Sequence, residues 1–124
     1  MPIQIEWKHK LPILVIEYSG NLTSKEYYDM CAKRQKLLDE GPEQVVVVAD
    51  TQDLEGFPEN KIIELCETII NHPHLSVLLV VLRKNLYQNL SRSMLGKTET
   101  LWRVNFFADA EAALNEAERL VARY

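Results

Sequence analysis

The sequence predicts a single α/β domain, in which a mixed but mostly parallel sheet has helices packed on it. Two runs, Val45–Ala49 and Val77–Leu82, are apolar on both faces, as expected of strands in the middle of a parallel sheet. Segments with helical spacing alternate with these strands, which is typical of βαβ units. With 124 residues, of which 47% are hydrophobic and 26% charged, the chain fits one domain spanning residues 1–124.

The first elements should be two strands and a helix. Alternating apolar and polar residues over 3–7 predict a half-buried strand, and the branched run 13–18 predicts a second one. The short break between them favours antiparallel pairing. Thr23 and Glu26 have the spacing of a capping box, and the helix that they begin should end at Gly41 in a left-handed conformation. The buried face of this helix should contain Tyr27, Met30, Cys31, Leu37 and Leu38.

Three strand–helix units should follow, which gives the order β-β-α-β-α-β-α-β-α. Asp50–Phe57 is polar and is predicted to be a loop, and Asp109 is suited to cap the last helix. The three units are predicted as strand 45–49 with helix 58–71, strand 77–82 with helix 85–95, and strand 104–107 with a helix after Asp109. The residues expected to be almost fully buried are Ile13, Val15, Val46, Val48, Ile69, Val80, Leu90 and Leu120.

This order resembles the STAS domain, the fold of bacterial anti-sigma-factor antagonists, which is also found at the ends of sulfate transporters. The resemblance covers nearly the whole chain. It depends on the element order, on the strand-plus-acid segment Val45–Asp50, and on the segment Phe106–Leu114, which is similar to the strand-to-helix joint that ends many such domains. The family is also loosely related to the CRAL-TRIO lipid carriers. The resemblance implies a regulatory or protein-interaction function.

One departure from the family concerns phosphorylation. Signalling STAS proteins carry an Asp-Ser pair at the start of the helix after the third strand, where the free N–H groups of the helix suit a phosphate. Here the family's spacing from Asp50 leads to Glu59, no serine occurs between Asp50 and Asn71, and the hydroxyls in that stretch are Thr51 and Thr68. We therefore predict a constitutive interaction surface without kinase control. Its residues would be Asp50, Thr51, Asp53, Phe57 and Glu59.

Charge is distributed unevenly along the chain. Residues 39–67 contain nine acids and one base, whereas residues 83–103 contain five bases and one acid. Arg83 and Lys84 follow a buried strand, and ligands of open α/β sheets bind beyond the carboxyl ends of strands, so this pair is a candidate anion-binding site. The net charge of −4 and the absence of a basic and aromatic stripe argue against nucleic-acid binding.

The sequence favours a non-enzymatic role without a cofactor. It contains no glycine-rich dinucleotide loop, phosphate-loop lysine or nucleophile-elbow serine. His72 and His74 flank a proline and are expected to contact helix-end carbonyls, not a metal ion. Met1-Pro2-Ile3 resembles the start of the tautomerases, in which an amino-terminal proline is the general base. The second strand that follows, in place of the helix of that family, and the preceding Met1 argue against this remote alternative.

Two functions remain open at this stage. The first is a regulatory or protein-interaction domain, with a protein partner or self-association. The alternative is a carrier of a small apolar or anionic ligand, such as a lipid, for which an apolar pocket is required. The apolar runs are too short for stable membrane insertion, and the start of the chain does not resemble a signal peptide, so we expect a cytoplasmic protein.

Overall fold

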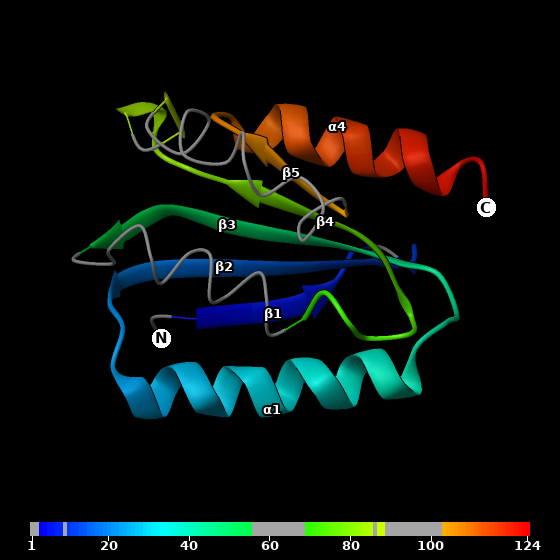
Figure 1. Ribbon diagram of the computed structural model, residues 1–124, viewed down its shortest axis with the longest axis horizontal. Coiled ribbons are helices and arrows are strands. Elements are labelled where there is room, and N and C mark those ends of the chain that lie inside the picture. Colours follow the sequence, from blue (N-terminus) through cyan, green and yellow to red (C-terminus); the bar gives the residue numbers. More distant parts are fainter. Residues whose placement is uncertain (1–2, 9, 56–68, 86, 89–102) are drawn as a thin grey trace.

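The computed structural model describes residues 3–8, 10–55, 69–85, 87–88 and 103–124, which form a sheet with one helix on each face (Figure 1). The order of the described elements is strand, strand, helix, three strands, helix. They are β1 (Ile3–Trp7), β2 (Ile13–Asn21), α1 (Ser24–Glu40), β3 (Val45–Glu55), β4 (Leu75–Val81), β5 (Val104–Phe107) and α4 (Ala110–Val121).

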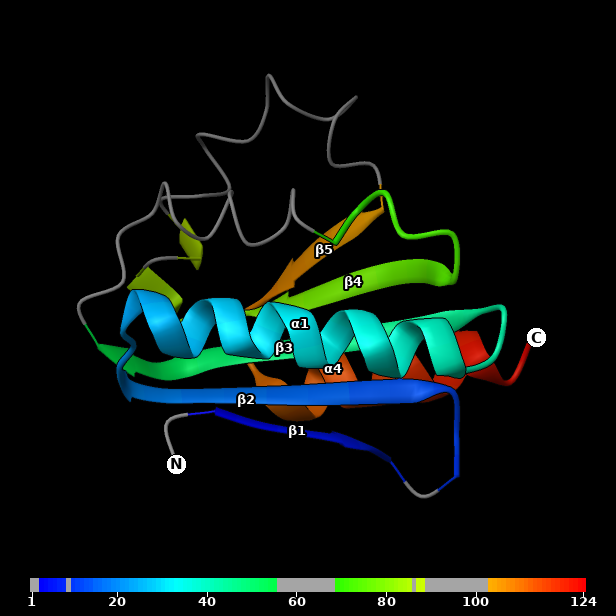
Figure 2. The same cartoon turned by 90° about the horizontal axis from the view of Figure 1, so that it is seen from below.

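The five strands form one mixed sheet in the order β1-β2-β3-β4-β5. β1 pairs antiparallel with β2, and all other pairs are parallel. α1 lies on one face and α4 on the other, as Figures 1 and 2 show from two directions. The predicted α/β class and the antiparallel first pair are confirmed. The helix predicted over 58–71 lies mostly outside the described residues, and the one over 85–95 is described only near its start.

The amino end of α1 is fixed by the predicted capping box. The backbone N–H of Glu26 donates to Oγ1 of Thr23 at 3.1 Å, and the N–H of Thr23 donates back to Oε1 of Glu26 at 3.1 Å. The prediction of a left-handed Gly41 is wrong, since its φ of −88° and ψ of −176° are extended backbone. Glycine stands there because a Cβ would lie 2.9 Å from Cη2 of Trp7.

The sheet-facing side of α1 contains an unpredicted charge. Met30 and Leu38 are buried as expected, and Arg34, at four residues from each, is also buried, with only 4% of its surface exposed. Three other residues of the predicted face, Tyr27, Cys31 and Leu37, are partly buried and pack against the core. A prediction of the buried face from hydrophobicity alone misses Arg34, because arginine counts as charged although its long aliphatic stem can be buried.

The core has one cluster on each face of the sheet. Val80 is among the predicted core residues that are buried, whereas Val15 and Leu120 are only partly buried. Val15 lies opposite Glu6 toward the β1 edge, while α4 packs mainly on β3 and β4. Leu90 lies outside the described residues. The predicted core residues that the structure places in the interior are Ile13, Val46, Val48, Ile69 and Val80.

β3 is longer than predicted. Residues 50–55, expected in a loop, continue the strand because β2 also extends beyond its predicted end and pairs with them. Gly20 lies opposite Leu54, and Asn21 lies opposite Glu55. The predicted interaction surface therefore begins on regular sheet structure and not on a loop.

Candidate functional site

A β-bulge shapes the predicted surface at the carboxyl end of β3. The register with β2 advances from Glu17 opposite Asp50 to Ser19 opposite Asp53, so β3 contains one extra residue. Successive side chains of a strand point to opposite faces, and residues three apart would normally diverge. The extra residue instead brings Asp50 and Asp53 to the same face, beside Glu17 and Ser19.

These side chains line a small acidic pocket of about 190 Å³. Val46 and Val48, which alternate with Asp50 along β3, belong to the core cluster under α4, so the pocket opens on the α4 face of the sheet. The described lining of the pocket contains three carboxylates and no basic side chain. Its lining residues are Gln4, Glu17, Tyr18, Ser19, Asp50 and Asp53.

The electrostatics of this pocket affect Asp50 most. Partial burial raises the pKa of the Asp50 carboxyl above its ordinary value, and the nearby charge of Asp53 raises it further. The backbone N–H of Gln52, which donates to Oδ1 of Asp50 at 3.0 Å, opposes the rise. A cationic group of a binding partner would relieve the repulsion between the two carboxylates.

Thr51 is part of the fold and not part of the accessible surface. Only 4% of its surface is exposed, and its Oγ1 donates to the carbonyl of Val81 at 2.7 Å. The sequence pattern, in which a hydroxyl directly follows an apolar strand, predicted an exposed residue. The bulge and the neighbouring β4 enclose it instead.

Arg83 supports the end of β3. Its Nε donates to the carbonyl of Gln52 at 2.7 Å, and the side chain of Gln52 donates to the carbonyl of Ala108 at 3.1 Å. This chain of contacts connects the carboxyl ends of β3, β4 and β5. Lys84 is exposed at the start of the helical residues that follow. The structure thus gives Arg83 a structural contact that its position in the sequence did not reveal.

The remaining members of the predicted set, Phe57 and Glu59, lie outside the described residues, as does Pro2. Of the predicted surface, the structure brings together Asp50 and Asp53, and it adds Glu17 and Ser19 from β2. No sequence signal pointed to these last two, because their proximity depends on strand register.

The two histidines at the opposite end of the sheet contact the end of α1. Nδ1 of His74 donates to the carbonyl of Leu38 at 2.6 Å, which is the helix-end contact predicted, although on a different helix from the one expected. His72 is buried, with Nε2 2.8 Å from Oδ1 of Asp39. Its Nδ1 accepts the backbone N–H of His74 at 3.0 Å. These contacts connect the segment just before β4 to the carboxyl end of α1.

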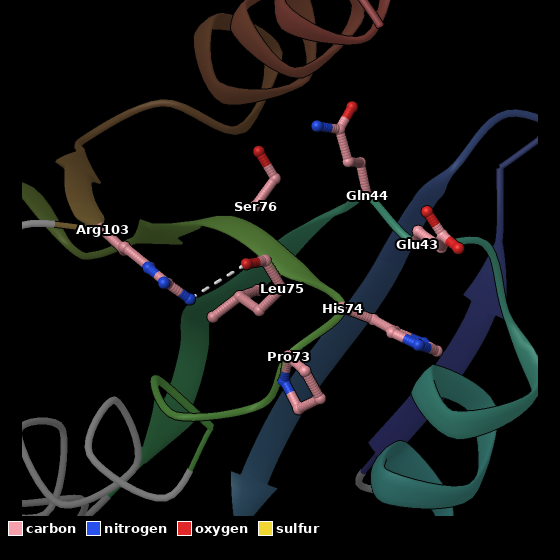
Figure 3. Close-up of a pocket in the computed structure, with 7 residues that line it drawn as sticks. All are labelled: Glu43, Gln44, Pro73, His74, Leu75, Ser76 and Arg103. Carbon is pink, nitrogen blue, oxygen red and sulfur yellow. Dashed lines mark hydrogen bonds between the residues drawn. The ribbon is translucent and has the colours of Figure 1, made fainter.

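A larger, open groove of about 660 Å³ lies next to these histidines, at the amino ends of β3 and β4 (Figure 3). The guanidinium of Arg103 extends along the groove and donates to the carbonyl of Leu75 at 3.2 Å. The groove is lined mainly by polar and charged side chains. Its residues are Glu43, Gln44, Pro73, His74, Leu75, Ser76 and Arg103.

The described surface at the carboxyl end of β3 carries acidic groups, of which three line the acidic pocket. Within the described ranges, no three His, Cys, Asp or Glu side chains are grouped so that they could hold a metal ion. No helix in this part of the chain is long and apolar enough to cross a membrane. The acidic pocket can accept hydrogen bonds and ion pairs from Lys or Arg side chains.

The fold is that of a SpoIIAA-like, or STAS-like, domain. A search of solved structures finds an uncharacterised protein of the DUF3478 family with a SpoIIAA-like fold from Shewanella loihica PV-4, which is 20% identical with a TM-score of 0.63. That match covers 93% of this chain and 91% of the other. The unphosphorylated anti-sigma factor antagonist SpoIIAA is 16% identical with a TM-score of 0.60, over 94% of this chain and 96% of the other.

Comparisons at the level of sequence give no further assignment. No protein-family model matches the chain, and no curated protein matches it. The structural likeness therefore establishes the fold, and the fold class and family resemblance inferred from the sequence are confirmed at that level.

Proposed function

We propose that this chain is a non-enzymatic regulatory domain that binds a protein partner constitutively through the carboxyl end of its sheet. The likeness to SpoIIAA, an anti-sigma factor antagonist, supports a regulatory role. The binding surface would combine Asp50 and Asp53 with Phe57 and Glu59 of the following segment, and Glu17 would add a third described carboxylate.

The observation that supports the proposed absence of kinase control is the burial of the Thr51 hydroxyl. Phosphorylation requires the hydroxyl to enter a kinase active site, whereas Oγ1 of Thr51 is enclosed and donates to the carbonyl of Val81. A phosphate on Thr51 would break this bond and place new negative charge near Asp50 and Asp53. No serine occurs in residues 50–71, and the other hydroxyl of this range, that of Thr68, lies outside the described residues.

The charge of the surface suggests the chemistry of its partner. Because burial and the charge of Asp53 already raise the pKa of Asp50, the pocket favours groups that bring positive charge. We infer that the partner presents Lys or Arg side chains and that the interaction takes place in the cytoplasm, without nucleic acid. An anion bound at Arg83 and Lys84 would be a separate site on the rim of the same surface.

The carrier alternative has less support from the described residues. A lipid or apolar ligand needs a concave, mostly apolar pocket. The acidic pocket and the groove of Figure 3 are both lined mainly by polar or charged groups. A partner-binding surface is therefore the better-supported function.

Site-specific photocrosslinking in the source cells tests the surface. A photoreactive residue is placed at Asp53, and the matched control is placed at Glu43, another exposed acid at the opposite end of the sheet. We expect the probe at position 53 to give a discrete crosslinked protein. This product should disappear when the Asp50→Asn variant is tested at high salt. Equal capture from positions 53 and 43 would refute the proposed surface.

Intact-mass measurement tests the absence of kinase control. The purified protein is incubated with ATP and the STAS-directed kinases of its source. We expect no added phosphate within residues 50–71. A stoichiometric phosphate on Thr51 or Thr68 would refute constitutive binding and restore the switch of the signalling family.

A further inference from the structure

The outer edge of β1 carries backbone groups that no strand of the described sheet uses. β1 lies at the end of the sheet, with β2 on one side only (Figure 2). Its pairing with β2 is regular from Ile3 to Trp7, without a bulge. An edge of this kind can pair with a strand of another chain unless proline, charged side chains or a bulge block it, and the described strand has no proline and no bulge, and Glu6 is its single charged residue.

The register defines which residues face outward. The N–H of Lys8 donates to the carbonyl of Ile13 at 2.9 Å, so this pair is hydrogen-bonded. Hydrogen-bonded and non-hydrogen-bonded pairs alternate along an antiparallel ladder. Glu6 and Gln4 therefore direct their backbone groups toward β2. Ile3, Ile5 and Trp7 direct theirs outward.

This arrangement is self-complementary. In an antiparallel pairing of two copies about a two-fold axis at Ile5, Ile5 faces its own copy, and Ile3 faces Trp7 of the other chain. These are the residues whose N–H and C=O groups point outward, so the pairing would satisfy all of them. The partly buried side chains of Ile3, Ile5 and Trp7 pack on the core at one face, and they would form a continuous apolar row across the axis.

The charges on the opposite face also fit a second copy. In this register the exposed Gln4 of one chain lies beside the exposed Glu6 of the other, so no like charges are opposed. Within its own chain, Glu6 faces Val15 and Gln4 faces Glu17. We propose that this chain forms a two-fold dimer by antiparallel pairing of β1 with β1 of a second copy, along the sheet edge whose Gln4 also lines the acidic pocket.

The dimer should be weak, because short edge strands bury little area. Sedimentation equilibrium of the full chain should show the mass rising from 14.4 kDa toward twice that value between roughly 10 µM and 1 mM. A mass that stays at 14.4 kDa throughout this range would overturn the proposal.

Charge variants test the register. Gln4→Lys places a lysine beside Glu6 of the other chain twice, by symmetry, and should lower the dimer Kd about 2- to 30-fold. Adding Glu6→Lys makes both pairs repulsive and should raise the Kd above that of the wild type by a similar factor of about 2 to 30. Glu6→Lys alone, which faces only Gln4 of the partner copy, is the control and should change the Kd little.

Gln4→Lys and the double variant are expected to change the Kd in opposite directions. This difference distinguishes pairing through β1 from a general effect of net charge. The chain carries a net charge of −4, so every added lysine reduces overall repulsion between two copies. If association depended on net charge alone, the double variant would dimerise most tightly. That order, or equal affinity in all four proteins, would refute pairing through β1. Thermal unfolding of each variant verifies that the domain is folded.

Discussion

Truncation of Val80 to alanine tests whether β4 is a buried interior strand of the sheet. The side chain of Val80 is 0% exposed and lies between Ala49 of β3 and Phe106 of β5. The change removes two carbon atoms, which costs about 1.6 kcal/mol in lost transfer free energy at about 0.8 kcal/mol per methylene. The cavity left behind adds between 0 and roughly 1.2 kcal/mol, according to how far its walls relax.

We therefore expect the free energy of unfolding to fall by about 1.5–3 kcal/mol. For a domain of this size, that corresponds to a decrease in Tm of roughly 5–15 °C. Urea unfolding followed by far-UV circular dichroism should show a lower midpoint with an unchanged slope, since the surface exposed on unfolding is nearly the same.

Val77→Ala is the matched control, because Val77 lies on the same strand and is only half-buried. The same chemical change should cost clearly less there. If Val80→Ala had the same effect as Val77→Ala, or an effect within experimental error, the assignment of β4 as a central strand would be refuted.

Three further predictions concern α1 and the acidic pocket. Thr23→Ala should lower the free energy of unfolding by about 0.5–2 kcal/mol through loss of the cap, while Thr23→Ser keeps it; equal stability of both variants in urea would contradict the capping box. Gly41→Ala should cost about 1–3 kcal/mol, because its Cβ overlaps Trp7, and Trp7→Phe in the same chain should recover part of that loss. Asp50→Asn should raise Tm at pH 7. The pKa of Asp50 is raised in the folded state, so its ionisation destabilises the fold above that pKa, and the gain should vanish at about pH 3, where both states are protonated. A gain that is independent of pH would show that charge is not its cause.

The features that could be predicted are those encoded within a few residues of each other. Thr23 and Asp109 were identified as caps because capping depends on a side chain and the next backbone N–H groups, and both accept such bonds. β5 has its predicted bounds, and β1 and β2 pair as expected of strands joined by a short turn. In each case the local pattern determines the structure.

The features that were missed depend on contacts between distant segments. Residues 50–55 have no apolar alternation, and they form a strand only because the end of β2 lies beside them. Arg34 has a charged side chain, but it is buried because it lies on the face of α1 that packs against the sheet. The end of α1 was assigned to a left-handed glycine, although the decisive contact is with Trp7 from a strand far along the chain.

The candidate site follows the same division. Asp50 and Asp53 were named from the sequence through its resemblance to the STAS family, whose phosphorylation site follows the third strand. Their side chains share one face of the sheet because of the bulge between β3 and β2, and no residue pattern in β3 predicts this bulge. The role of Arg83 as a donor to the carbonyl of Gln52 likewise requires the relative position of two strands.

The order of strands in the sheet has a consequence for how the domain folds during synthesis on the ribosome. Among the described strands, the order across the sheet is the same as the order along the chain, from β1 to β5. Each new strand emerging from a ribosome therefore finds its partner at an edge that is already present. None of the described strands has to wait for a later one or insert between two that are already paired. Growth from one side lets the sheet assemble during synthesis and shortens the time in which unpaired apolar strands such as β4 are exposed to aggregation.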